Sequence, residues 1–363
     1  MNAAERHYGI VTAAYWGFTL TDGALRMLVL LHFYKLGYSP FTLAFLFLLY
    51  EAAGVLANLI GGWLATRYGI ARMLTVGLVT QIIGFGLLSA LQPDWTAAMS
   101  VAWVVLAQGV CGVAKDLTKT ASKSAIKVTQ AQAKDQGNGQ LFKWVAWFTG
   151  SKNAMKGVGF FLGGLLLATL GFSGAVLAMA AALGLVWIAS LVLLKRDLGK
   201  ARAKPKFTEL LSKSAAINRL SAARLLLFAA RDVWFVVALP VYLSTVFGWE
   251  FWLVGGFLAS WVIGYGIVQS LAPRITGKQS GHVPDGRTAF VWAALLAGLP
   301  ALIALGLGTG WSAQVVLLGG LMLFGVLFAV NSSLHSYLIV SYAKEDGVSL
   351  DVGFYYMSNA MGR

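Results

Sequence analysis

The chain has 363 residues, of which 58% are hydrophobic and only 12% are charged, and its mean hydropathy is +0.73. The charged fraction is about half of that in soluble domains, which excludes an ordinary soluble enzyme. The formal charge of +14 lies mainly in alternate loops, as membrane insertion requires, and this distribution argues against a nucleic-acid-binding protein. The sequence therefore predicts an all-α integral membrane protein.

Long apolar windows predict membrane-spanning helices, because a helix satisfies its own backbone polar groups in lipid. The first window carries charges and lacks a cleavage site, so it is interpreted as a retained span rather than a signal peptide. The predicted spans lie at 8–33, 41–65, 73–91, 97–118, 144–170, 174–194, 222–247, 251–272, 289–307 and 313–340, and an eleventh begins near 351.

The loops between these spans alternate in charge. One set, which includes the N-terminus, holds 21 of the 28 lysines and arginines, and the opposite set holds only Lys35. Basic loops stay in the cytoplasm during insertion. The pattern therefore predicts a cytoplasmic N-terminus.

A long basic loop after the sixth predicted span divides the chain. We expect a six-span N-terminal half at 1–194, a cytoplasmic linker at 195–221, and a C-terminal half at 222–363 that holds spans seven to ten and the start of the eleventh. Two repeats joined by a cytoplasmic linker are typical of secondary transporters. A short echo, Asn-Ala-Met at 153–155 and again at 359–361, supports the repeat.

The loop after the second span carries a spaced glycine and arginine pattern: Gly62, Arg67, Gly69 and Arg72. It resembles the conformational loop motif of the major facilitator superfamily, although Thr66 replaces the acidic residue. This resemblance implies a bundle of two six-helix halves, and hence that the last one and a half spans are missing from this chain. Gly157, Gly159, Gly163 and Gly164 form a second, helix-packing pattern in the fifth span.

Lysines recur at every fourth position where the fourth span meets the next loop. Lys115, Lys119, Lys123 and Lys127 drift by only about 40° per step on a helix, so they share one broad stripe. A lysine inside a span is costly and usually faces a cavity. We expect Lys115 and Lys119 to reach the mouth of such a cavity, and Lys123 and Lys127 to contact lipid headgroups at the cytoplasmic surface.

The fifth span contains Lys152 and Lys156, which share one helical face. They either snorkel to the cytoplasmic interface or face the cavity. Only apolar and glycine residues follow Lys156, which favours the cavity for that side chain.

The first span of each half carries an acid and a base. Asp22 and Arg26 are four residues apart and can pair, either as a structural ion pair or as a pair that a substrate anion opens. Arg231 and Asp232 are adjacent and point about 100° apart, so they need not pair with each other.

Glu51 lies in the second span with no basic neighbour in the sequence. Desolvation favours the neutral form of an isolated carboxylate, which suits proton coupling. The alternative is a partner on another helix, either Arg231 or Lys152.

Within the spans, cations exceed carboxylates, which favours an anionic substrate over sodium or a cationic drug. Predicted substrate-binding residues are Arg26, Lys115, Lys119, Lys152, Lys156, Arg231, Asn153, Asn331, Tyr355 and Asn359, and His335 is a further hydrogen-bonding candidate. Predicted coupling or ion-pair residues are Asp22, Glu51, Asp116 and Asp232.

No catalytic, cofactor or metal site is expected. The four histidines have no metal-ligand spacing, and no phosphate-binding loop is present. A membrane acyltransferase would need a histidine–acid pair at the mouth of a span, for which His335 is the nearest candidate. The single cysteine, Cys111, excludes a disulfide framework and a thiolate metal cluster.

Three long, charge-specific stretches resemble the ArsJ family of organoarsenical efflux permeases: residues 19–51, 115–127 and 141–164. The resemblance implies efflux of 1-arseno-3-phosphoglycerate, which forms when glyceraldehyde-3-phosphate dehydrogenase uses arsenate in place of phosphate. It also implies arsenate resistance, a monomer in the bacterial cytoplasmic (inner) membrane, and that dehydrogenase as a functional partner. An oxyanion fits this chain, because arsenite would need two or three thiolates.

Two other functions remain open. The first is an exporter or exchanger of another organic anion or a sugar phosphate, whereas the principal expectation is export of the oxyanion by alternating access coupled to protons. In a different class, the chain would be a non-transporting scaffold or receptor on the same fold.

Overall fold

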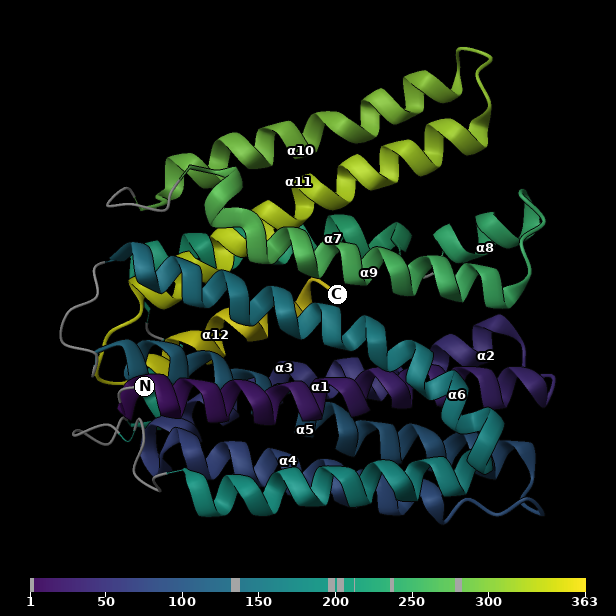
Figure 1. The fold of residues 1–363 in the computed structure, drawn as a ribbon, viewed down its shortest axis with the longest axis horizontal. Coiled ribbons are helices and arrows are strands. Elements are labelled where there is room, and N and C mark those ends of the chain that lie inside the picture. The colour runs from purple at the N-terminus through teal and green to yellow at the C-terminus, as the bar shows by residue number, and fades with distance from the viewer. Residues whose placement is uncertain are drawn as a thin grey trace.

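The chain forms a bundle of long helices in the computed structural model (Figure 1), which confirms the predicted all-α fold class. The structure describes residues 3–131, 138–194, 200, 206–211, 213–235, 238–277 and 283–363. Seven helical segments among these are long and apolar enough to cross a membrane. The first-half helices are α1 (Ala3–Lys35), α2 (Pro40–Phe45), α3 (Leu48–Tyr68), α4 (Ile70–Ser89), α5 (Ala97–Ala131) and α6 (Asn138–Leu193).

The remaining elements begin with a short 3₁₀ turn. They are η1 (Phe207–Leu210), α7 (Ala215–Phe235), α8 (Ala238–Thr245), α9 (Phe251–Ile275), α10 (Gly286–Leu307), α11 (Ala313–Tyr342) and α12 (Val348–Met361). Part of the predicted linker, residues 195–199, 201–205 and 212, lies outside the described residues. The division of the chain into 1–194, 195–221 and 222–363 therefore stays a prediction.

The fifth and sixth predicted spans both lie within α6, and Gly171, in the predicted loop between them, adopts a φ of 68° that separates two helical stretches, as predicted. Figure 1 shows the chain turning there and running back along the bundle. The fourth predicted span was expected to end at 118, but α5 continues as helix to Ala131. This extension places the whole lysine stripe inside the bundle rather than in a loop.

Helices α1 and α6 pack with their backbones in close contact. A Cβ on Gly163 would lie 2.2 Å from the Ala24 carbonyl oxygen, and one on Gly159 would lie 2.4 Å from that of Leu20. Only glycine permits this approach, so the predicted packing pattern in the fifth span is a helix contact. The close fit fixes where Lys152 and Lys156 of α6 lie relative to α1.

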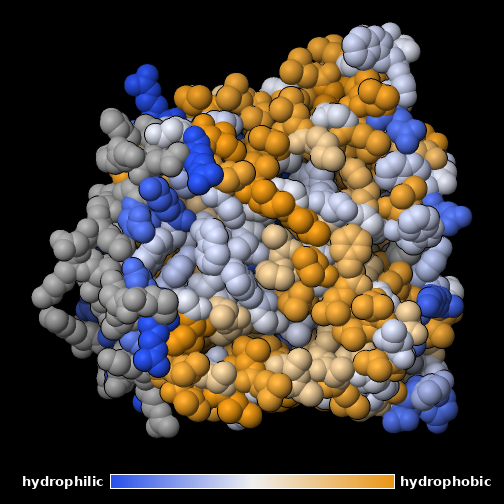
Figure 2. All heavy atoms as spheres, viewed as in Figure 1, coloured by the Kyte–Doolittle hydropathy of each residue, from blue (hydrophilic) through white to orange (hydrophobic). Residues whose placement is uncertain are grey.

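Helices from the two predicted halves also meet, chiefly α6 with α9 and α3 with α12. Figure 2 shows hydrophobic side chains over the flanks of the bundle and hydrophilic side chains gathered toward its two ends. This distribution is what a lipid bilayer around the spans requires.

The glycine and arginine loop joins α3 to α4. Gly69 has a φ of 101° and separates the two helices, and the Arg67 guanidinium lies over the Trp63 ring at 5.3 Å. The hydroxyl of Thr66 donates to the Gly62 carbonyl at 3.0 Å. The loop is therefore a tight turn between two helices, with Arg67 half-buried and Arg72 exposed at the surface.

Candidate functional site

The lysine stripe on α5 is largely buried. Lys123 is 1% exposed and its ammonium donates to the Thr149 hydroxyl at 2.5 Å. Lys127 donates to the carbonyl oxygens of Ser341, at 3.1 Å, and of Ala343. The expectation that Lys123 contacts lipid headgroups is wrong, because α5 continues into the bundle and α6 covers this side chain. Lys127 is half-buried, and its expected contact with headgroups stays a prediction.

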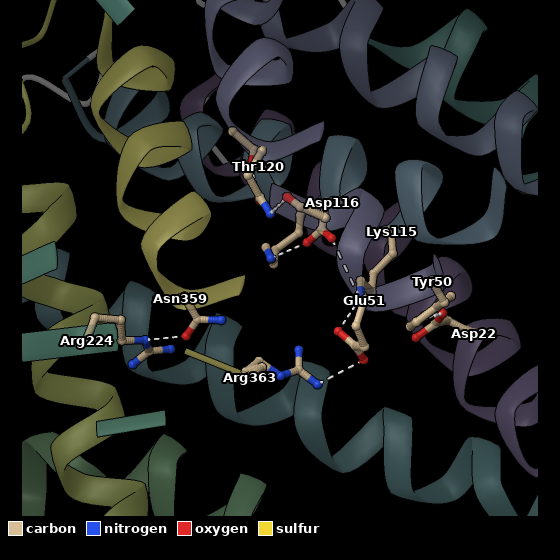
Figure 3. Close-up of polar contacts among 12 residues, drawn as sticks. Asp22, Tyr50, Glu51, Lys115, Asp116, Thr120, Arg224, Asn359 and Arg363 are labelled. Carbon is tan, nitrogen blue, oxygen red and sulfur yellow. Dashed lines mark hydrogen bonds and ion pairs between the residues drawn. The ribbon is translucent and has the colours of Figure 1, made fainter. Parts of the chain in front are cut away.

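The Glu51 carboxylate is the hub of an ion-pair network (Figure 3). Its oxygens lie 2.7 Å from the Arg26 guanidinium, 3.0 Å from the Lys115 ammonium and 3.2 Å from the Arg363 guanidinium. The prediction of an isolated carboxylate is wrong, and so are the alternative partners Arg231 and Lys152. The Arg26 and Glu51 side chains remain 25% and 27% exposed, so the network is open to solvent.

Asp22 does not take Arg26 as its partner, contrary to the predicted pairing along α1. It accepts a hydrogen bond from the Tyr50 hydroxyl and lies 3.5 Å from the Lys156 ammonium. The physical reason is that α3 presents Tyr50 and Glu51 together to α1. Tyr50 therefore takes Asp22 and Glu51 takes Arg26.

The Asp116 carboxylate contacts two lysines of its own helix, α5. It accepts a hydrogen bond from Lys119, and one of its oxygens lies 3.6 Å from the Lys115 ammonium. One turn further, the Thr120 hydroxyl donates to Asn58 of α3 at 3.0 Å. Lys115 thus links Asp116 to the Glu51 network.

The charges of α7 join the same network. Arg231 pairs with the adjacent Asp232, although the helical geometry did not require this pair. Asp232 also lies 3.0 Å from the Arg363 guanidinium. Because Arg363 contacts Glu51 as well, it connects α7 with α3.

Arg224, which the sequence interpretation missed, is 4% exposed. It donates to the Asn359 side-chain oxygen at 2.8 Å and to the Ser332 hydroxyl at 3.2 Å (Figure 3). It lies two turns before Arg231, so both side chains extend from nearly the same face of α7. The sequence did hold a signal for Arg224, because it is a cation within the apolar window 222–247.

The predicted uncharged residues separate into two groups. Asn153 donates to Gln269 of α9, and Asn331 donates to the Trp292 carbonyl of α10 at 2.8 Å, which directs it away from the Arg224 contacts. By contrast, the Tyr355 hydroxyl and His335 Nδ1 are buried with no hydrogen-bond partner among the described residues. Tyr355 lies beside Arg224, whose guanidinium is 5.4 Å from its ring.

Lys152 differs from the other cations near the network because it has no polar partner among the described residues. Within the described residues its ammonium has no hydrogen bond and no ion pair, and the strongest influences of charged groups on it come from the cations Lys156, Lys119, Arg363 and Arg224.

The contacts described above bring together nine cations and four carboxylates among the described residues. The cations are Arg26, Lys115, Lys119, Lys123, Lys152, Lys156, Arg224, Arg231 and Arg363, and the carboxylates are Asp22, Glu51, Asp116 and Asp232. Such an arrangement can hold an anion, and Lys152 marks where the compensating negative charge is absent.

Comparisons with known proteins agree on one family. The Major Facilitator Superfamily profile matches residues 11–363, whereas no curated protein sequence matches the chain. The human organic anion transporter MFSD10 (TETRAN) superposes with a TM-score of 0.74 at 16% identity, over 100% of this chain and 92% of its own.

Two further solved structures have the same fold. A bacterial homologue of the iron transporter ferroportin, in an outward-facing state, gives a TM-score of 0.72 at 13% identity, over 98% of this chain and 89% of its own. The proton:xylose symporter XylE gives 0.71 at 11% identity, over 99% and 87%. The chain therefore belongs to the Major Facilitator Superfamily, and it is a multi-pass membrane transporter of small-molecule substrates rather than an enzyme.

Proposed function

We propose that the chain exports an organic oxyanion that binds among the cations of α5, α6 and α7 and Arg363, which follows α12. The observation that carries this proposal is Lys152, a half-buried ammonium with no hydrogen bond or ion pair among the described residues and with Lys156, Lys119, Arg363 and Arg224 around it. Leaving such a group unpaired is costly, so a ligand that supplies negative charge would be bound strongly there. Arg224 and the unpartnered Tyr355 hydroxyl offer donors to a second part of the same ligand.

The proposed substrate is 1-arseno-3-phosphoglycerate, as the ArsJ resemblance implies. Its 3-phosphate and its acyl arsenate are two separated tetrahedral oxyanions that would need several cations, and guanidinium groups suit such oxyanions. The proposal includes glyceraldehyde-3-phosphate dehydrogenase as the source of the substrate, a monomer, and the bacterial cytoplasmic membrane with a cytoplasmic N-terminus.

Alternating access is supported by contacts at the end of the bundle that carries the basic loops. There the Lys127 ammonium of α5 donates to the carbonyl oxygens of Ser341, at the end of α11, and of Ala343, just after it. The ammonium of Lys213 in the predicted linker lies 3.4 Å from the Asp351 carboxylate of α12. Burial lowers the pKa of Lys213, and Asp351 opposes that shift. These contacts close the proposed cytoplasmic side, so this conformation would release the anion outward.

Glu51 is the proposed coupling residue, because one proton on it would weaken its contacts with Arg26, Lys115 and Arg363 together. We expect Glu51→Gln to abolish transport driven by a pH gradient while anion exchange without a gradient continues. The measurement is radiolabelled anion flux in vesicles. Gradient-driven flux equal to that of the wild type would rule out this role.

The substrate is tested by expressing the chain with the dehydrogenase in arsenate-sensitive bacteria. We expect arsenate resistance that Arg26→Ala, Lys156→Ala and Arg231→Ala each abolish at unchanged membrane abundance, while the exposed Lys206→Ala serves as control. Absence of resistance with retained flux of 3-phosphoglycerate would favour the second candidate, a carrier of another organic anion or sugar phosphate. Arsenate resistance retained by cells carrying each of the three variants would refute the anion site.

A further inference from the structure

A groove lies where α1, α6 and α9 meet, outside the ion-pair network. Its volume is about 660 Å³, and its lining includes Tyr8 of α1, Trp144 and Trp147 of α6, and Ile267 of α9. The Tyr8 hydroxyl donates to the Trp144 carbonyl at 2.9 Å and the two rings stack at 4.6 Å. One wall is thus a fixed aromatic surface.

Two cations stand on the rim of this groove, Lys143 in the first turns of α6 and Arg274 in the last turn of α9. Both side chains are exposed, and the residues that line the groove include no aspartate or glutamate. The ligand that complements this rim is an anion. Unlike the Glu51 network, the site has no carboxylate among the described residues that line it.

Below the two cations the groove is lined by apolar side chains that are exposed on the flank of the bundle. Trp147 is 45% exposed, Ile267 is 53% exposed and Leu271 is 39% exposed. All three belong to helical segments apolar enough to span a membrane. A ligand with hydrocarbon chains would cover this surface, whereas free phosphate would leave it in contact with bulk lipid. Tryptophan and tyrosine beside basic residues are typical of the headgroup level of a bilayer.

The groove has walls from both predicted halves of the chain. A Cβ on Gly150 of α6 would lie 2.3 Å from the Gly266 carbonyl of α9, so the two backbones touch at its floor. The groove therefore exists only while α6 and α9 are in contact, and a ligand in it would favour that contact.

We propose that this groove binds an anionic phospholipid, whose phosphate contacts Lys143 and Arg274 and whose acyl chains lie along Trp147, Ile267 and Leu271. Basic pockets between spans on the cytoplasmic side bind acidic headgroups in this way. The site is independent of the transported substrate, and its test does not require transport.

The test reconstitutes the full chain in phosphatidylcholine nanodiscs with a small fraction of brominated lipid, which quenches nearby tryptophan fluorescence. We expect brominated phosphatidylglycerol to bind about tenfold more strongly than brominated phosphatidylcholine, since each cation contributes to headgroup attraction. Trp144→Phe with Trp147→Phe should remove this saturable component of quenching among the 13 tryptophans.

The charge-removing pair Lys143→Gln with Arg274→Gln should abolish the preference for the acidic lipid. The charge-retaining pair Lys143→Arg with Arg274→Lys should keep it. So should the control pair Lys206→Gln with Lys344→Gln, which removes two exposed cations outside the groove. Equal binding of the two lipids, or a preference that survives Lys143→Gln with Arg274→Gln, would overturn the proposal. So would saturable binding of inorganic phosphate in lipid-free detergent with the same dependence on Lys143 and Arg274, because that would indicate a free-phosphate site.

Discussion

Lys152 combines a cost to the folded protein with a proposed role in binding the substrate. Its neighbours Lys119, Lys156, Arg224 and Arg363 each have a partner, whereas Lys152 has none among the described residues. An uncompensated charge in a low-dielectric surrounding destabilises the fold. Residues of this kind persist where a ligand supplies the missing charge.

Replacing Lys152 should therefore separate stability from transport. We expect Lys152→Gln to lower anion flux at least about tenfold, the loss expected when one charged contact is removed, and to raise the thermal unfolding midpoint in detergent. Lys152→Arg should retain part of the flux, and Lys206→Gln should change neither quantity. A lower unfolding midpoint for Lys152→Gln would show that Lys152 is a stabilising residue.

At the scale of elements, the long helices α5 and α6 create the site. Helix α5 carries its lysines inward because it does not end at the predicted boundary near 118. Helix α6 brings Lys152 and Lys156 beside α1 because glycines let the two backbones touch. The helix contact and the charge network therefore depend on each other.

The glycine contact between α1 and α6 can be tested with two neighbouring positions. Gly163→Ala would place a methyl group 2.2 Å from the Ala24 carbonyl oxygen, whereas the nearest atom to a methyl group at Gly164 is Leu31 Cδ1 at 3.6 Å. We expect Gly163→Ala to destabilise the protein by about 2 kcal/mol through overpacking, and Gly164→Ala to be neutral or slightly stabilising. Thermal unfolding of the purified proteins measures both, and equal midpoints would contradict this account.

The sequence predicted the fold class and most helices, because hydropathy and the need to satisfy backbone groups act locally. It did not predict the partners of Glu51 and Asp22, since these depend on how α3 crosses α1. The prediction that Lys123 lies at the lipid surface was wrong, because the polar end of α5 packs against α6 at this residue. The roles of the predicted site residues in binding and coupling stay predictions.

For the whole molecule, contacts between α5 and α11 and between the predicted linker and α12 carry the proposal that one end of the bundle is closed. Lys127 is central to the proposed closure, since it donates to two carbonyl oxygens of the predicted C-terminal half. A transporter needs its two conformations to be close in free energy, so each such contact changes their ratio.

Removing the Lys127 contacts should open that end. We expect Lys127→Met to shift the equilibrium by about 1 kcal/mol, or roughly fivefold, from the net contribution of a hydrogen bond in proteins. Spin labels on the exposed positions Arg72 and Arg219 should then show a larger population of long distances. The same labels on Lys206→Met should match the wild type. An unchanged distance distribution in Lys127→Met would mean that Lys127 does not hold the halves together.

The crowding of like charges around Lys152 also has a kinetic consequence. Lys152 belongs to the first predicted half and Arg224 and Arg363 to the second, so in the proposed cycle an unoccupied protein would rearrange its halves with these repelling groups unscreened. An anion bound between them would remove this barrier for the loaded protein only. The return of the empty carrier would then limit the cycle, and an anion added on the opposite side of the membrane would speed the release of the one already inside.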